Sequence, residues 1–170
     1  MNTNPKIKVK PTPFTKQLEI ANYFLISVFW IVTSLAYKHL PDEIPTHYNG
    51  LGEVDAYGHK ITIFLLPIIA SILFIVLTIT AKKPHTFNYS ETITTENVDA
   101  HYKNAMRFMQ TLNLFVLLIF IFIDYKTIQI AFNKSESLGV WFLPISGIIA
   151  VLIISYSVIQ SQKNKNKYDG

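Results

Sequence analysis

The chain contains no cysteine, and this absence excludes several kinds of chemistry at once. Disulfide bridges, thiolate nucleophiles and cysteine-based metal centres all require that residue. The sequence also contains no phosphate-binding loop, no dinucleotide-binding glycine pattern and no Ser–His–Asp order of a known hydrolase. We therefore nominate no catalytic residue from the sequence.

Charge is scarce as well. Only 15% of the 170 residues are charged and half are apolar, whereas soluble domains carry about 25% charged residues. The lysines behind the net charge of +4 are scattered at the ends of apolar runs. A nucleic-acid-binding module would instead present a basic face interleaved with aromatic residues. The composition therefore indicates that the partner of this protein is the lipid bilayer and not nucleic acid.

Four long apolar runs dominate what is present. A helix of about 20 residues rises roughly 30 Å, which is the thickness of a bilayer's hydrocarbon core. The sequence thus predicts an all-α fold, an integral membrane bundle of four transmembrane helices with a 20-residue outer loop and an amphipathic inner segment. The expected parts are a cytoplasmic basic tail at 1–17, a membrane domain at 18–160 with spans near 18–37, 61–80, 108–125 and 140–159, and a second cytoplasmic basic tail at 161–170.

The distribution of lysine and arginine predicts the orientation. Eleven of the 15 basic residues lie in the two tails and in the loop between the second and third spans; the other four are Lys38, Lys60, Lys126 and Lys134. Cytoplasmic segments carry the excess of positive charge. We expect a multi-pass protein of the cell membrane with both termini cytoplasmic and the His47 loop outside.

A cleaved signal peptide is the alternative for the first span. Four lysines precede its apolar core, and Ser34, Leu35 and Ala36 have the small-x-small form of a cleavage site. The run is long for a signal sequence and long enough to cross a membrane, which favours an uncleaved helix.

Two polar features lie further along the chain. Thr95 is a candidate N-cap for a helix with Glu96 and Asp99 in its first turn, and apolar residues then recur at helical spacing. This pattern predicts the amphipathic segment, lying on the membrane surface. Asn113 is the deepest clearly polar side chain of the spans, and an interhelical hydrogen bond is its expected role.

The loop between the first two spans concentrates the polar chemistry. Within 13 residues it holds two imidazoles, two carboxylates and an amide, from His47, Asn49, Glu53, Asp55 and His59. Nitrogen and carboxylate ligands suit zinc and similar divalent metals, for which His47, Glu53 and Asp55 are the candidates. The spacing matches no established metal signature. A self-satisfied polar turn without any cofactor is the other interpretation.

The same loop carries a resemblance to a known family. Its pattern I-P-x-H-Y-N-x-x-G-x-x-D-x-x-x-x-K resembles the hallmark loop of a bacterial membrane domain family of unknown function, found at the N-terminus of SdpI-like immunity proteins. Residues 87–102 resemble the family's inner loop, whereas 155–162 lack the G-N-x-x-P-type segment of the full immunity proteins. The loop motif is met by Pro45, His47, Asn49, Gly52, Asp55 and Lys60.

The resemblance implies a multi-pass protein of a bacterial inner membrane, related to proteins that protect a cell from a secreted killing peptide. Three function classes stay open. The first is a binding module whose outer loop engages a peptide, a lipid headgroup or another membrane protein in the extracytoplasmic space. The second is a metal site with hydrolytic chemistry in the outer loop, and the third is a structural subunit of a membrane complex.

Overall fold

Each of the four apolar runs folds as a helix long and apolar enough to cross a membrane. The computed structural model describes residues 4–168, and the side chains up to residue 165. Within that range the long helices are α1 (Pro13–Tyr37), α2 (Leu65–Ala81), α3 (Val98–Ala131) and α4 (Phe142–Tyr168), and a 3-10 helix, η1 (Lys60–Phe64), leads into α2. The protein is therefore a multi-pass membrane protein of mainly helical structure.

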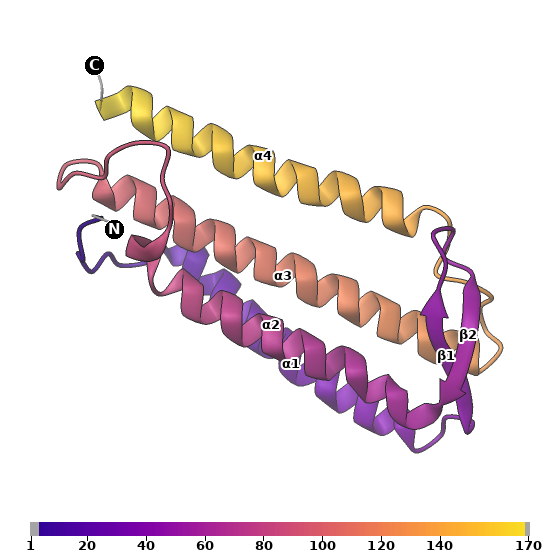
Figure 1. Ribbon diagram of the computed structural model, residues 1–170. Coiled ribbons are helices and arrows are strands. Elements are labelled where there is room, and N and C mark those ends of the chain that lie inside the picture. The colour runs from indigo at the N-terminus through magenta and orange to yellow at the C-terminus, as the bar shows by residue number, and fades with distance from the viewer. Residues whose placement is uncertain (1–3, 169–170) are drawn as a thin grey trace.

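The helices form a bundle with two distinct ends (Figure 1). The N- and C-terminal parts of the chain lie at one end, the terminal end, together with the α2–α3 connection. A pair of strands lies at the other, the hairpin end. Helices α1, α2 and α3 pack on one another, whereas α4 packs chiefly on α3. No residue in the apolar part of α4 is fully buried, and most are exposed, as expected of a helix with lipid on all sides but the one that meets α3.

Packing among α1, α2 and α3 combines an apolar centre with polar bridges. The centre is formed by Ile26, Phe29, Ala70, Phe74 and Leu117. The Asn113 amide in α3 donates to the Phe74 carbonyl (3.3 Å) and to Thr78 Oγ1 (3.1 Å) of α2. This confirms the interhelical hydrogen bond that the sequence predicts for Asn113. Such bonds hold helices together where lipid offers no competing partner.

Helix α1 begins earlier than the expected span. Thr12 caps its N-terminus by accepting a hydrogen bond from the Thr15 amide, and Pro13 occupies the first helical position, where its missing N–H costs nothing. At the other end of the chain α4 continues through residues 161–168. Parts of both expected tails are therefore helical, and at the N-terminal end the Thr12 cap marks where α1 begins.

The expected outer loop is a β-hairpin, so the described chain is not purely α-helical. Strands β1 (Glu43–Tyr48) and β2 (Val54–His59) pair antiparallel, with irregular register between Pro45 and Tyr48. The loop's mixed polar and small residues give no clear alternation, the usual sequence signal of a strand. The hairpin forms because its base and tip are fastened to the helices, which local sequence does not reveal.

The expected amphipathic segment is the first part of α3 and is covered by protein. Its apolar face, with Val98, Tyr102 and Met106, packs against Val9, Tyr89 and Ile93. Tyr102 also donates to the Pro5 carbonyl at 2.7 Å. This corrects the prediction of a helix lying on the membrane surface, because the N-terminal segment and the α2–α3 connection cover the face instead.

The cap before α3 also differs from the predicted one. Thr94 and Asn97, rather than Thr95, exchange bonds: the Thr94 amide donates to Asn97 Oδ1 (2.9 Å) and the Asn97 amide to Thr94 Oγ1 (3.4 Å). The helix itself begins at Val98. Asn97 is thus the N-cap residue, its side chain makes no capping hydrogen bond to α3, and the Thr94–Asn97 bonds close the turn before the helix.

Candidate binding site beneath the hairpin

Lys60 closes the base of the hairpin. Its ammonium lies 3.0 Å from Asp42 Oδ1, 3.4 Å from the Leu40 carbonyl and over the Tyr37 ring. The Lys60 amide also donates to the Asp42 carbonyl at 2.8 Å. The Lys60 ammonium holds the pKa of the Asp42 carboxyl below its ordinary value. The lysine thus ties the end of α1 to the start of η1.

The first strand is anchored in the bundle by its apolar residues. Ile44 is fully buried and packs with Leu40 and Ile63, and Pro45 beside it is buried as well. At the end of the strand the Tyr48 hydroxyl lies 2.7 Å from Thr127 Oγ1 of α3. Burial raises the pKa of the Tyr48 hydroxyl. One strand of the hairpin is therefore fixed to α3.

Asn49 organises the turn between the strands. Its Oδ1 accepts hydrogen bonds from the Leu51 and Glu53 amides (2.9 and 3.0 Å), and its Nδ2 donates to Glu53 Oε2 (2.8 Å). Asparagine suits this position because its short side chain can replace backbone partners in a turn. The amide of the predicted cluster therefore shapes the loop.

Gly52 joins the turn to the connection between α3 and α4. Its carbonyl accepts from the Leu138 amide at 2.8 Å, and Glu53 and Ser137 form an isolated bridge beside it. Gly52 has a φ of +79°, and a Cβ there would lie 3.0 Å from the Gly139 carbonyl oxygen. Position 52 therefore requires glycine, both for its left-handed backbone and for the close approach of the Gly139 carbonyl. The hairpin tip is thus held against the start of α4.

His47 and Asp55 form an exposed pair across the strands, with Nδ1 and Oδ1 2.6 Å apart. The other members of the predicted cluster lie elsewhere. Glu53 bonds Asn49, and His59 accepts from the Ile61 amide at the start of η1. Within residues 4–168 no three His, Asp or Glu side chains converge as a metal site would require. The metal interpretation stays a prediction, with His47 and Asp55 as its nearest pair.

A pocket of about 420 Å³ lies under the hairpin. One wall is the motif segment from Pro45 to Asn49, and the other walls come from the hairpin ends of α2, α3 and α4. The helical side is mainly apolar, with Ile69, Ile123 and Leu143 among its residues, while His47, Asn49 and Thr127 add polar groups. Apolar walls with a few polar groups are typical of ligand sites.

Several residues that line this pocket could not be predicted from the sequence. Thr127 and Leu138 come from parts of the chain far from the loop motif, and threonine or leucine near an apolar run carries no signal of its own. Asp124, one turn before Thr127, is by contrast a clear signal in the sequence, because placing a carboxylate inside a membrane span costs free energy. It lies buried in α3 with its Oδ2 2.9 Å from Thr33 Oγ1 of α1.

The comparisons with known proteins match the same part of the chain. Residues 24–70 match the model of a protein family described as "Domain of unknown function (DUF1648)". That stretch contains most of α1, the hairpin, η1 and the start of α2. It includes every residue of the loop motif.

One curated relative is an "Uncharacterized protein" of the archaeon Archaeoglobus fulgidus. It is 31% identical over 103 residues, which cover 58% of this chain and 55% of the relative. The chain therefore spans about half the length of the curated relative that it matches. No solved structure matches. In sequence this membrane protein is thus similar to a domain family and to a relative that both lack a described function.

Proposed function

We propose that the hairpin and the pocket beneath it bind an extracytoplasmic partner, either a peptide or a segment of another membrane protein. The observation that supports this most is the position of the pocket. Motif residues form one wall of it, and apolar residues at the ends of three membrane helices form the rest. A partner with one apolar and one polar side would meet matching surfaces there.

The hairpin is built to hold that pocket in shape. Lys60 fixes its base, Tyr48 fixes one strand to α3, and Gly52 fixes its tip to the start of α4. A rigid wall lowers the entropy lost on binding. The exposed His47–Asp55 pair adds a polar group that a peptide can meet from outside.

Protection against a secreted killing peptide is the specific form of this proposal. It rests on the resemblance of the loop to the N-terminal part of SdpI-like immunity proteins, in a bacterial inner membrane. The alternatives are a structural subunit of a membrane complex and a metal-dependent site in the hairpin. The His47–Asp55 contact is the observation that favours the metal.

Photo-cross-linking in living cells tests the binding site. A photoreactive amino acid at Ile69, which lines the pocket and is 44% exposed, should trap a discrete partner. The matched control is Ile72, which is 57% exposed on the same helix but does not line the pocket. An identical adduct pattern at both positions, or no adduct at Ile69, contradicts the proposal.

The immunity form has its own test. Cells that lack the protein should be killed by conditioned medium from the parent strain, and the wild-type chain should restore survival. Asn49→Ala should restore it poorly, because the turn loses three hydrogen bonds. Equal survival with and without the protein would exclude immunity and leave the other partners open.

A further inference from the structure

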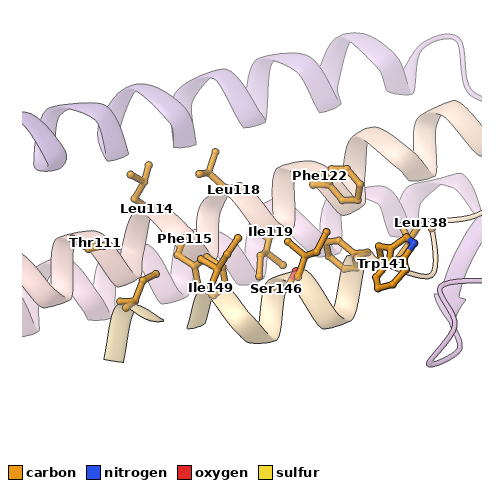
Figure 2. Close-up of a pocket in the computed structure, with 14 residues that line it drawn as sticks. Thr111, Leu114, Phe115, Leu118, Ile119, Phe122, Leu138, Trp141, Ser146 and Ile149 are labelled. Atoms are coloured by element: carbon orange, nitrogen blue, oxygen red, sulfur yellow. The ribbon is translucent and has the colours of Figure 1, made fainter. Parts of the chain in front are cut away.

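The seam between α3 and α4 contains a second hollow, which adjoins the pocket under the hairpin and shares Leu138 and Phe142 with it. Its volume is about 580 Å³, and its walls include Leu114, Phe115, Phe122, Phe142, Ile145 and Ile149. Figure 2 shows these side chains arriving from the two helices, with Leu138 and Trp141 at one end and Thr111 at the other. The lining is almost entirely apolar and comes from two membrane-spanning helices and, at one end, from Leu138, Gly139 and Trp141 of the connection between them.

Toward the terminal end the residues that line the seam become polar. A small polar pocket of about 110 Å³ lies there, and its walls include Lys103, Asn104, Arg107, Gln160 and Asn164. Asn104, Arg107, Thr111, Leu114 and Leu118 follow one another at spacings of three and four, so they share one face of α3. The polar pocket and the apolar hollow are therefore consecutive parts of one seam.

Arg107 has no acidic partner among the residues that the structure describes. Its guanidinium lies 5.1 Å from the centre of the Tyr156 ring and donates to Asn104 Oδ1 at 3.4 Å. The neighbouring Lys103, by contrast, is paired with Asp99 at 2.6 Å. A planar guanidinium fork suits the oxygens of a phosphate group. The polar pocket thus presents an uncompensated charge beside an apolar hollow.

We propose that this seam binds one anionic phospholipid, with its phosphate beside Arg107 and an acyl chain in the hollow. The phosphate would meet the positive charge in the polar pocket, and the acyl chain would meet the apolar walls of the hollow. Phospholipid is also already present in the bilayer around α4. A second copy of the chain could cover the hollow with an apolar helix, but it would leave the Arg107 charge uncompensated. Charge complementarity therefore favours the lipid.

Native mass spectrometry and thermal unfolding of the full-length protein in detergent test this site. The probes are phosphatidylglycerol and phosphatidylcholine with the same acyl chains, each added alone. We expect one tightly held phosphatidylglycerol per chain and a larger rise in Tm than with phosphatidylcholine. Arg107→Gln should lower phosphatidylglycerol occupancy about tenfold, because one charged contact is lost.

Two further variants separate this site from other causes. Lys83→Gln removes an exposed lysine at the same end of the bundle and should leave occupancy unchanged. Ser146→Phe fills the hollow and should weaken binding of both lipids. Equal phosphatidylglycerol occupancy in wild type and Arg107→Gln overturns the proposal. So does an equal rise in Tm from inorganic phosphate alone, or a lipid-independent dimer that Ser146→Phe disrupts.

Discussion

Thr33 and Asp124 join α1 to α3 through a hydrogen bond of 2.9 Å between Thr33 Oγ1 and Asp124 Oδ2, both side chains being buried. The second carboxyl oxygen of Asp124 has no hydrogen-bond partner among the described residues. The threonine is therefore the partner that compensates a buried acid within the helices.

Thr33→Val should destabilise the bundle, because Asp124 would lose this partner. Interhelical hydrogen bonds in membranes contribute about 0.6 kcal/mol on average and up to about 1.7 kcal/mol, and we expect the upper part of that range. Thermal unfolding in detergent measures the change. The control is Thr80→Val, because Thr80 bonds only the Val76 carbonyl of its own helix. Equal effects of the two variants would show that Thr33 does not bridge the helices.

Gly52→Ala should loosen the hairpin tip. The left-handed backbone costs about 1–2 kcal/mol with a side chain, and the new Cβ meets the Gly139 carbonyl. Hydrogen exchange of the Leu138 amide, which donates to Gly52, should become faster. Gly50→Ala is the matched control in the same turn, since a Cβ there meets nothing within 4 Å. Unchanged Leu138 exchange in Gly52→Ala would count against the docking contact.

The Lys60–Asp42 pair predicts a small effect at acidic pH. Because Lys60 lowers the pKa of Asp42 in the folded protein, the pair stabilises the hairpin base above the ordinary value of 3.8. That contribution is lost as the pH falls through the lower, folded value. Carboxyl carbon NMR should show Asp42 titrating below 3.8, and nearer 3.8 in Lys60→Gln. The same titration in both proteins would rule out the ion pair in solution.

The orientation is testable because the chain has no native cysteine. We expect Gly50→Cys at the hairpin tip to react with an impermeant thiol reagent on intact spheroplasts, and Asn88→Cys at the terminal end to react only after lysis. Both positions are exposed. The expectation follows from the excess of lysine and arginine at the terminal end. Labelling of Asn88→Cys alone would reverse the orientation.

A divalent metal, if bound, should depend on His47. Elemental analysis of the purified protein beside His47→Ala should then show metal near one equivalent in the wild type and little in the variant. Affinity should fall as the solution is acidified, because protons compete with the metal for its ligand atoms. Equal traces of metal in both samples would remove the hydrolytic alternative.

The four helices could be predicted because a long uncharged run can satisfy its backbone hydrogen bonds in lipid simply by forming a helix. The interhelical hydrogen bond of Asn113 could be predicted because a side-chain amide within a span needs a partner. The hairpin could not. Its strands depend on the Gly52–Leu138, Tyr48–Thr127 and Lys60–Asp42 contacts, and only the last of these lies within the loop itself. The protein contacts of the amphipathic segment are unpredictable for a related reason, since its apolar face, which includes Tyr102, is covered by distant residues such as Val9.

The attachment of α4 has a mechanical consequence. This helix packs chiefly on α3, and the connection before it is held to the hairpin by the hydrogen bond between Leu138 and Gly52, next to Gly139 with a φ of +95°. The two pockets meet at this attachment, where they share Leu138 and Phe142, so a tilt of α4 would alter both. A ligand in the pocket under the hairpin would then influence the tilt of α4 and, with it, the width of the seam between α3 and α4. Occupancy of the two pockets would be coupled, and by linkage each would alter the affinity of the other.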